Sequence, residues 1–532
     1  MNRRKLLTMS GAVLAGALSD ADAFSRERRE SRCTNSHNAS QMRLPTTDVH
    51  YQWVQDYVEE TPDADYRHAS QAALDAFRDL KFGVRIHWGI YSILGQPKGP
   101  LPFSEPNGPW DFLEMSNEQR QEYQDLYRTW NPTEFDAEQW MALFSRSGAK
   151  CFAFTTKHHD GFSMFDTHAH VQRRVNWGAS SDPCLEDCNL SYSIMDTPFH
   201  RDVVRELCDA ARRYGIRIDL YFSHADWYDA DFRPYAFHPL QTPHDSPVDR
   251  DFVDKQGWGP ESRFNRWAAI VPDADAEEVQ RMLVRHRKQL HELLTRYGKI
   301  DMVCFDQWLG PRVWAQLKAT IKELRSIQPD LMFRARGIGN YGDYYTPEGF
   351  VPDAPENTDM PWMTIYPLGN SFSYIESDSF KGAKWIIDNV VDAAAKGGNF
   401  MAGIGADPTG KFHPTAIAQL EEAGAWLRRN GEAIYATRHL RTRWKDGENV
   451  RFTWRKDGTV LYATSLKRPA GKLVLHSVRA RPSSTVTLLG HGNTPVNWTQ
   501  ADSDLLIELP HDIPDALAYT FKVTLESAVN CG

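Results

Sequence analysis

Four short apolar runs in this chain each end abruptly at polar or ionisable side chains. The runs cover residues 81–86, 151–156, 216–222 and 300–305. The side chains that follow them include His87 and Trp88, His158 and His159, Ser223 and His224, and Asp306. Helix-like segments separate the runs, which indicates buried parallel strands joined by helices. In parallel sheets and barrels the site lies beyond the carboxyl ends of the strands, so these side chains are predicted to meet at one edge.

The segments between these runs support an α/β arrangement. Residues 135–147, 202–214 and 279–297 have helical patterns, and each pattern is followed or closed by a glycine. Further apolar runs at residues 331–336 and 397–405 bring the strand candidates to six. We therefore predict a (β/α)8-like TIM barrel over residues 69–437, in which the remaining strands are weaker or irregular.

The character of the sequence changes near Arg438. From there, short β-rich segments alternate with turns that contain Gly, Asp or Pro, which predicts a C-terminal antiparallel β-sandwich over residues 438–532. A chain of 532 residues has room for both domains. Residues 234–272, rich in Pro, Asp and Arg, follow a strand end and are predicted to be a functional loop or a mere insert.

The first residues have the order of parts found in export signals. Arg3, Arg4 and Lys5 form a basic start, residues 6–18 are moderately apolar, and residues 21–23 read Ala-Asp-Ala, a small-x-small cleavage site. The paired arginines followed by two leucines resemble a twin-arginine signal. We expect an export signal over residues 1–23, a polar segment over 24–68, and a location in the bacterial periplasm or outside the cell. A disordered basic tail is the alternative.

Composition narrows the range of partners. A net charge of −9 argues against nucleic acid as a ligand, because phosphate binding needs clustered Lys and Arg. No segment after the export signal is long and apolar enough to span a membrane. Seventeen tryptophans offer flat apolar faces of the kind that bind sugar rings. Cys184 and Cys188 are either disulfide-bonded or free. No His or Cys cluster has metal-ligand spacing, so neither a metal nor a cofactor is expected.

Five motifs occur in the order found in one enzyme family. They are residues 81–92, 148–162, 196–202, 220–227 and 397–410. Over residues 69–413 the chain resembles the retaining α-L-fucosidases of glycoside hydrolase family 29. The resemblance implies a glycoside hydrolase that acts on a fucosylated glycan or a related glycoside, through an Asp nucleophile and a glycosyl-enzyme intermediate, and the N-terminal signal adds the expectation that it is exported.

Asp306 falls on the position of the family's nucleophile. A carboxylate at the carboxyl end of a barrel strand, next to Trp308, is placed to attack an anomeric carbon. A retaining glycosidase pairs this nucleophile with a second carboxyl, about 5–5.5 Å away, that acts first as acid and then as base. An aspartate that caps the following helix is the structural alternative.

The resemblance also implies a set of residues that contact the sugar. They are His87, Trp88, Trp110, His158, His159, Tyr221, Trp308, Arg336 and Trp362. Arg336 either reaches the sugar ring or pairs with Asp343. Metal binding by the histidines competes with sugar binding, but no carboxylate or cysteine stands at ligand spacing from them.

Two departures from the family pattern bear on catalysis. The family's Pro-Trp-Glu stretch, whose Glu is the acid/base in many members, reads Pro-Trp-Met here and ends at Met363. An earlier family Glu-Trp pair reads Pro109-Trp110. Among the carboxylates that could compensate, which are Glu348, Glu356, Asp359 and Glu376, we predict Glu356 as the acid/base. The alternatives are a hydrolase of another glycoside, such as a galactoside, and a catalytically impaired carbohydrate-binding protein.

Overall fold

The computed structural model describes residues 60–96, 108, 115–178, 184–232, 274–307, 309, 313–356, 358–510 and 512–530. Several sequence predictions concern other positions. The export signal, most of the polar segment 24–68, Trp110, Trp308 and the loop 234–272 lie outside the described residues. In the part of the chain that is described, no helix combines the length and the apolar character needed to cross a membrane.

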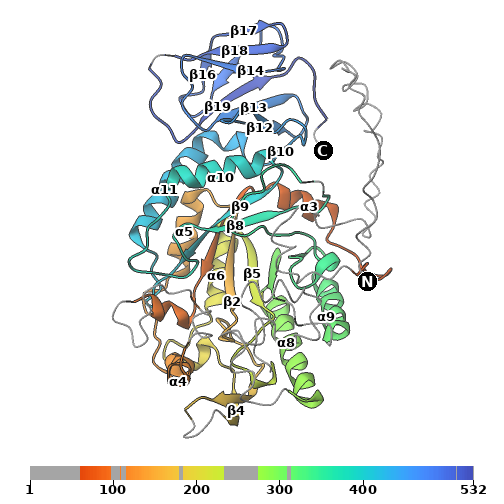
Figure 1. Cartoon of the computed structure of the whole chain (residues 1–532), viewed down its shortest axis with the longest axis vertical. Helices are drawn as coiled ribbons and strands as arrows, with labels where there is room; N and C mark the ends of the chain where they lie inside the picture. Colours follow the sequence, from red (N-terminus) through yellow and green to blue (C-terminus); the bar gives the residue numbers. More distant parts are fainter. Residues whose placement is uncertain are drawn as a thin grey trace, which may run out of the picture. The chain divides into compact units, whose positions relative to one another are not determined.

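A parallel sheet of seven strands forms the centre of the larger domain (Figure 1). The strands are β1 (Phe82–His87), β2 (Cys151–Lys157), β5 (Arg217–Ser223), β6 (Met302–Asp306), β7 (Met332–Phe333), β8 (Met363–Pro367) and β9 (Asn399–Gly405). Their order is β7-β6-β5-β2-β1-β9-β8, and every neighbouring pair is parallel. β1 and β2 are buried along their whole length. Burial on both faces explains why apolar residues predominate in the first part of both strands.

An irregular extended segment, residues 344–348, lies between β7 and β8 and takes the place of an eighth strand. Parallel bridges join Tyr344 to Arg334, just beyond β7, and join Glu348 to Ile365 in β8. The predicted (β/α)8-like barrel is therefore confirmed. The six strands predicted from the sequence did not include β8 or the segment 344–348.

Helices alternate with the strands, and Figure 1 shows α5 and α11 on one side of them and α8 and α9 on the opposite side. The α-helices are α3 (Gln71–Arg78), α4 (Asn117–Asp125), α5 (Ala137–Ser147), α6 (Val203–Tyr214), α8 (Ala276–Arg296), α9 (Trp314–Ile327), α10 (Ala383–Ala395) and α11 (Pro414–Asn430). The short 3-10 helices are η2 (Ile90–Gly95), η4 (Leu126–Arg128), η5 (Ile194–Asp196), η6 (Ala230–Phe232), η8 (Gly339–Tyr341) and η9 (Gly431–Ala433). α5 contacts both α6 and α11, and α8 contacts α9.

Capping residues set the limits of these helices. The Asp136 side chain caps α5 at its N-terminus, and Gly148 ends the helix in the left-handed region with φ 85°. α8 begins at residue 276, slightly earlier than the helical pattern from 279 suggests. The reason is a capping box, in which Asp275 and Glu278 bond to each other's backbone N–H groups.

A two-stranded antiparallel hairpin, β3 (Val171–Asn176) and β4 (Cys184–Leu190), extends from the barrel after β2. Cys184 and Cys188 both lie on β4, and both are free thiols. Four residues along a strand separate their Cα atoms by about 13 Å. A disulfide needs Cα atoms within about 7 Å. Of the two alternatives for Cys184 and Cys188, the structure therefore favours free thiols over a disulfide between them.

The C-terminal domain consists of antiparallel strands, as predicted. These are β10 (Thr437–Arg438), β11 (Lys445–Asp446), β12 (Val450–Arg455), β13 (Val460–Ser465), β14 (Lys472–Leu475), β15 (Val486–Leu488), β16 (Thr494–Val496), β17 (Trp498–Ala501), β18 (Asp504–Glu508) and β19 (Tyr519–Thr524). One sheet has the order β10-β12-β13-β19-β15-β16, with β11 paired to β12, and the other has the order β14-β18-β17. Alternate side chains of both sheets enclose a separate apolar core that includes Phe452, Leu488 and Ile507.

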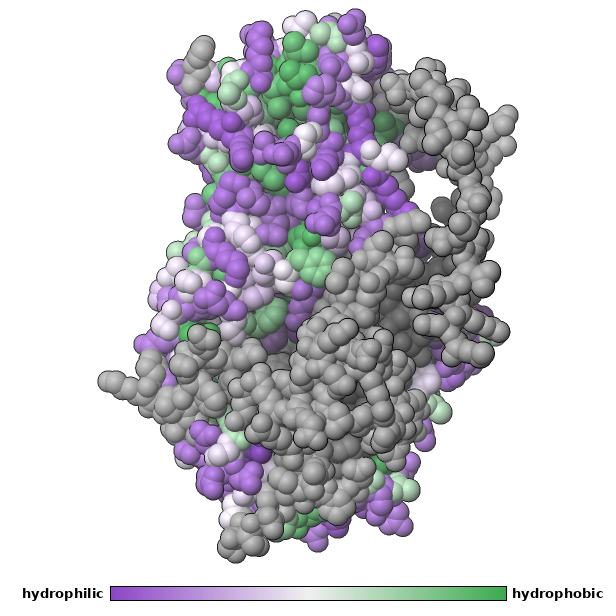
Figure 2. Space-filling view, viewed as in Figure 1, coloured by the Kyte–Doolittle hydropathy of each residue, from purple (hydrophilic) through white to green (hydrophobic). Residues whose placement is uncertain are grey.

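The described surface is mostly hydrophilic, as Figure 2 shows. A small apolar area appears at the top of that view, over the strands of the C-terminal domain. Val474 of β14, which is 39% exposed, is one of the few large apolar side chains of the described surface with that much exposure. Single exposed apolar residues are ordinary on soluble surfaces.

Candidate active site

The carboxyl ends of four neighbouring strands, β1, β2, β5 and β6, bring polar side chains to one edge of the barrel. His87 is the last residue of β1, and His158 follows β2. Ser223 at the end of β5 is in register with Asp306 at the end of β6. The edge predicted from the four apolar runs therefore exists.

Asp306 lies at the centre of this group. Its Oδ2 accepts a hydrogen bond from the Tyr221 hydroxyl at 2.8 Å, and its Oδ1 accepts one from Arg336 Nη1 at 3.0 Å. The Nε2 atom of His159 is 3.8 Å from Oδ2. The backbone N–H of Gln307 also donates to Oδ1, at 3.1 Å, from a residue with φ 67°. This left-handed φ is uncommon for a residue other than glycine, so the strand ends in a strained turn that holds the carboxylate in place.

The Asp306 carboxyl is ionised at neutral and mildly acidic pH. Burial alone would raise its pKa, but the guanidinium groups of Arg336 and Arg334, together with His159 and the Tyr221 hydroxyl, hold that pKa well below the ordinary 3.8. The residue is only 8% exposed. An ionised, poorly hydrated carboxylate of this kind is a suitable nucleophile.

His159 is a neutral imidazole beside Asp306. Its Nδ1 lies 2.5 Å from Ser223 Oγ, and its ring centroid lies 5.2 Å from that of Trp227. Burial lowers the pKa of His159 to about 4, although the Asp306 charge opposes this shift. The other ring nitrogen of His159, Nε2, lies on the side of the ring nearer to the Asp306 carboxylate.

Two further histidines line the same edge. The His158 ring stacks on the Tyr221 ring with centroids 5.1 Å apart, and it lies 5.5 Å from the His87 ring. The Phe372 ring, from the loop after β8, is 4.8 Å from the His87 ring. Burial lowers the pKa of His87 and of His158 well below 6.5. The Nδ1 atom of His87 is buried and has no hydrogen-bond partner among the described residues, which suits a ligand hydroxyl.

A second carboxylate, Glu348, shares a donor with Asp306. Arg336 Nη1 donates to Glu348 Oε2 at 2.8 Å and to Asp306 Oδ1 at 3.0 Å. Because both oxygens contact the same nitrogen, they are less than about 6 Å apart, which includes the spacing of a retaining pair. The Glu348 side chain is 31% exposed and that of Asp306 is 11% exposed, so Glu348 lies nearer to solvent. Asp343, the other partner considered for Arg336, instead bonds to Arg325 at 2.5 Å.

Glu356, the acid/base predicted from the sequence, does not lie at this edge. Its carboxylate accepts a hydrogen bond from the Tyr345 hydroxyl at 3.2 Å. Tyr344 points into the barrel, where its hydroxyl is 3.5 Å from Asp219 Oδ2. Because successive side chains of an extended segment point in opposite directions, Tyr345 and its partner Glu356 are on the outside. Glu348, four residues after Tyr344, is on the inside.

Met363 stands at the amino end of β8. It is paired with Asn399, the first residue of β9, and it packs in a buried cluster with Met302 and Met332, which begin β6 and β7. A strand of this length spans about 13 Å between its amino and carboxyl ends. A methionine at position 363 therefore removes no side chain from the edge that carries Asp306.

Two of the predicted sugar-binding tryptophans belong to the core. Trp88 has no exposed surface, and its Nε1 donates to the carbonyl of Asp407 at 2.8 Å. Trp362 is 4% exposed and lies against Gly398 at the amino end of β9. Neither ring face is open to a sugar. The rings packed on Trp88 are Trp130, Phe135 and Trp140.

Three residues outside the predicted set of catalytic and sugar-binding residues also reach the site, and one of them, Ser223, was predicted to lie at this edge. Ser223 and Trp227 contact His159, and their motif, residues 220–227, was already a recognisable pattern. Phe372 comes from an irregular loop, and no periodicity or spacing singles it out. Among the described residues, no group of three or more His, Cys, Asp or Glu side chains is placed to hold a metal ion.

A barrel with two neighbouring carboxylates at the carboxyl ends of its strands is an arrangement that glycoside hydrolases have. Comparison with family models makes the assignment specific. The model described as Alpha-L-fucosidase matches residues 51–432, and the model described as Alpha-L-fucosidase C-terminal domain matches residues 445–524. The chain belongs to the alpha-L-fucosidase family and is a glycosidase.

Individual relatives agree with this assignment. The chain is 28% identical to the tissue alpha-L-fucosidase of Homo sapiens over 481 residues, which cover 84% of this chain and 88% of the human protein. Its structure is similar to alpha-L-fucosidase isoenzyme 1 from Paenibacillus thiaminolyticus, with a TM-score of 0.67, 25% identity, and coverage of 86% and 99% of the two chains. A GH29 alpha-L-fucosidase from Bacteroides thetaiotaomicron, captured as a covalent intermediate with 2-fluoro-fucosyl fluoride, shares the fold with a TM-score of 0.68 at 21% identity, over 89% of this chain and 99% of that one.

Proposed function

We propose that this protein hydrolyses α-L-fucosides with retention of configuration, with Asp306 as the nucleophile and Glu348 as the acid/base. The observation that carries the proposal is that both carboxylates bond to the same nitrogen of Arg336, at 3.0 and 2.8 Å. The two oxygens are therefore less than about 6 Å apart, a range that includes the spacing of a retaining pair. Family membership supports fucose as the sugar.

In the first step a carboxylate oxygen of Asp306 attacks the anomeric carbon, and the glycosidic C–O bond breaks. The departing oxygen takes a proton from the Glu348 carboxyl. In the second step the Glu348 carboxylate accepts a proton from water, and that water attacks the anomeric carbon. The ester bond to Asp306 breaks, and α-L-fucose leaves with the anomeric configuration of the substrate.

The surrounding groups have defined tasks in this proposal. The Tyr221 hydroxyl and Arg336 orient the two oxygens of Asp306. His159, His158 and His87 are neutral at working pH, so their ring nitrogens bind sugar hydroxyls without adding charge.

Hydrolysis of nitrophenyl α-L-fucoside and of a natural fucosyl oligosaccharide tests the proposal directly. We expect cleavage of both, because Glu348 can protonate an alkoxide leaving group. Cleavage of a galactoside in preference to both fucosides would support the alternative substrate. Tight glycan binding without any turnover would support the alternative of a binding protein and contradict the proposal.

The dependence of kcat/KM on acidic pH can be predicted from the pKa values of the buried residues at the site. Asp306 stays ionised, the pKa of His159 is lowered to about 4, and burial lowers the pKa of His87 and His158 well below 6.5, so neither Asp306 nor these histidines gain a proton between pH 7 and 5. We expect kcat/KM for nitrophenyl α-L-fucoside to decline only as pH approaches 4. Residual activity at pH 7, measured after incubation at low pH, controls for unfolding. A decline centred near pH 6.5 would contradict this account, because it would show a histidine of ordinary pKa at the site.

Export through a twin-arginine pathway is a further part of the proposal, supported by the order of basic, apolar and cleavage segments in residues 1–23. Replacing Arg3 and Arg4 together by lysine is expected to keep the protein in the cytoplasm of a bacterial host with this pathway. Cell fractionation and immunoblotting measure the distribution. Unchanged export of the Arg3→Lys, Arg4→Lys protein would contradict the pathway.

A further inference from the structure

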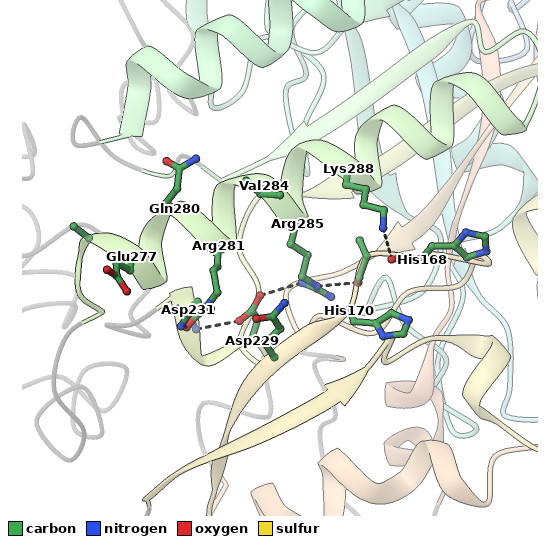
Figure 3. A pocket seen from close by; sticks show the side chains of 13 residues that line it. His168, His170, Asp229, Asp231, Glu277, Gln280, Arg281, Val284, Arg285 and Lys288 are labelled. Atoms are coloured by element: carbon green, nitrogen blue, oxygen red, sulfur yellow. Dashed lines mark hydrogen bonds and ion pairs between the residues drawn. The ribbon is translucent and has the colours of Figure 1, made fainter.

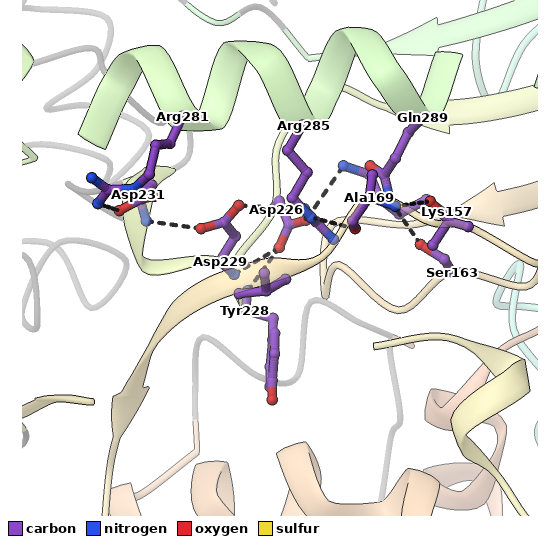
Figure 4. Close-up of polar contacts among 12 residues, drawn as sticks. Lys157, Ser163, Ala169, Asp226, Tyr228, Asp229, Asp231, Arg281, Arg285 and Gln289 are labelled. Carbon is purple, nitrogen blue, oxygen red and sulfur yellow. Dashed lines mark hydrogen bonds and ion pairs between the residues drawn. The ribbon is translucent and has the colours of Figure 1, made fainter. Parts of the chain in front are cut away.

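A buried ion network lies behind the site and joins the ends of β2 and β5 to α8 (Figure 4). Asp226, three residues after β5, is at its centre and has no exposed surface. Its Oδ2 accepts a hydrogen bond from Arg285 Nη1 at 2.7 Å and lies 3.5 Å from Lys157 Nζ. Its Oδ1 accepts from the backbone N–H groups of Tyr228 and Asp229 at 3.0 and 2.9 Å. Four donors thus fix one carboxylate.

The same carboxylate lies against the turn that carries His158 and His159. A Cβ atom added to Gly161 would be only 2.1 Å from Asp226 Oδ1, and Gly161 has φ +78°. A glycine is therefore required here, both by the left-handed backbone and by the close approach of Asp226. The backbone N–H of Trp227 donates to the carbonyl of His159 at 2.7 Å, which ties the two segments together.

Lys157 completes this connection. It immediately precedes His158, it is fully buried, and its ammonium lies 4.5 Å from the centre of the Phe222 ring and 5.6 Å from that of Phe232. A buried ammonium among aromatic rings needs an opposite charge nearby, and Asp226 supplies it. The Asp226 carboxylate thus contacts the side chain of the residue at which the histidine turn begins.

The outer end of the network provides a matched comparison. Asp231 is 2% exposed and accepts hydrogen bonds from Arg281 Nε and Nη2, both at 3.0 Å. Asp231 and Arg281 line a groove of about 570 Å3 along α8, together with Asp229 and Arg285 (Figure 3). Asp226 and Asp231 are thus two buried aspartates that each bond to an arginine of α8, but only Asp226 lies against the histidine turn.

We propose that Asp226 is a positioning residue, which fixes the turn 158–161 and thereby places His159 beside Asp306. The inference deepens the proposed function and rests on it for its activity measurement. The chain of contacts runs from Asp226 through Gly161 and Trp227 to the imidazole that lies 3.8 Å from Asp306 Oδ2. A displacement of about 1 Å at a reacting centre can lower the rate about 10²-fold.

The substitution Asp226→Asn tests this inference. Asparagine keeps the size of the side chain and one oxygen for the backbone N–H groups, but it removes the charge that faces Lys157 and Arg285. We expect kcat for nitrophenyl α-L-fucoside to fall about 10²-fold and KM to rise, because the displaced turn carries His158 and His159, which both bind the sugar in the proposed function. The control Asp231→Asn removes the charge of another buried aspartate that bonds to α8, although its partner Arg281 is 35% exposed, and it is expected to change kcat less than about threefold.

Circular dichroism and thermal melts show whether each variant is folded, so kcat can be expressed per folded molecule. If Asp226→Asn fails to fold, Lys157→Met serves instead, because methionine fits among Phe222 and Phe232. It leaves Asp226 paired with Arg285, so a smaller loss of kcat, about tenfold, is expected. Equal losses in Asp226→Asn and Asp231→Asn, or near-wild-type kcat in folded Asp226→Asn and Lys157→Met, would overturn the inference.

Hydrogen exchange, measured by mass spectrometry, separates this inference from the proposed function. We expect faster exchange in a peptide covering residues 157–163 of Asp226→Asn, and no change in that peptide of Asp231→Asn. This result does not require any hydrolysis. If the wild-type protein cleaves no fucoside, the proposed function fails, whereas unchanged exchange in Asp226→Asn overturns the positioning role by itself.

Discussion

Replacing Asp306 with alanine is expected to lower kcat/KM for nitrophenyl α-L-fucoside by at least about 10⁴-fold, because the reaction loses its nucleophile. The effect should be catalytic rather than structural. Removal of the Asp306 carboxylate leaves Arg336 with its ion pair to Glu348, so this guanidinium does not become an unpaired buried charge. The variant should therefore fold, and thermal melts and circular dichroism measure this.

Two companion variants sharpen the Asp306 test. Asp301→Ala removes an aspartate that stands immediately before β6, at the opposite end from Asp306, where it bonds to Arg217 at 3.2 Å. We expect this control to retain activity. In Asp306→Gly, sodium azide should restore turnover and give a fucosyl azide of inverted configuration, since azide then attacks in place of the carboxylate. Substantial hydrolysis by Asp306→Ala, without added nucleophile, would remove Asp306 from its proposed role.

Glu348→Gln is the second large effect that we expect. Glutamine can still accept the hydrogen bond from Arg336, but it cannot donate a proton to a leaving group. For a natural fucosyl oligosaccharide, kcat/KM is expected to fall by about 10²–10⁴-fold. For nitrophenyl α-L-fucoside the loss should be smaller, about tenfold, since nitrophenolate departs without protonation. The ratio of the two losses is the measurement that identifies the acid.

Glu356→Gln is the matched control for Glu348. Both glutamates follow β7 in the same stretch of chain, but Glu356 bonds to Tyr345 on the outside of the barrel. We expect Glu356→Gln to change neither rate by more than about threefold. The opposite pattern, with Glu356→Gln selective against the natural substrate and Glu348→Gln near wild type, would restore Glu356 as the acid/base.

Much of the fold could be predicted because local signals agree with the tertiary structure. Runs such as residues 151–154 are apolar at every position since both faces of a parallel strand are buried. Asp136 and Gly148 mark the ends of α5 through capping and a left-handed φ, which depend only on neighbouring residues. The strand ends also predicted the meeting of His158, His159 and Asp306, because parallel order alone brings them to one edge.

The segment that takes the place of the eighth barrel strand had no local sequence signal of this kind. Residues 344–348 form only isolated bridges, and their sequence, Tyr-Tyr-Thr-Pro-Glu, contains a proline that cannot donate a ladder hydrogen bond. The choice between Glu348 and Glu356 depended on this segment, because its pleat decides which side chains face inward. Without the bridge from Glu348 to Ile365, the two glutamates were equivalent loop carboxylates.

Burial also separates tryptophans that look alike in sequence. Trp88 follows His87 at a strand end, and its neighbourhood in the sequence is that of a binding residue. Its Nε1 nonetheless bonds to the carbonyl of Asp407, more than three hundred residues further along the chain. Contacts between residues so far apart in the sequence cannot be predicted from local patterns. Trp88 was therefore predicted to contact the sugar, whereas its indole lies in the core.

The measurement that tests the central claim most directly is covalent trapping of the wild-type protein with 2-fluoro-fucosyl fluoride, followed by proteolysis and mass spectrometry. The 2-fluoro substituent slows release of the glycosyl-enzyme, so a nucleophile that has attacked remains labelled. We predict one fucosyl adduct, on Asp306, with Glu348 unlabelled. The absence of any adduct, or an adduct on a carboxylate other than Asp306, would contradict a retaining fucosidase that acts through this residue.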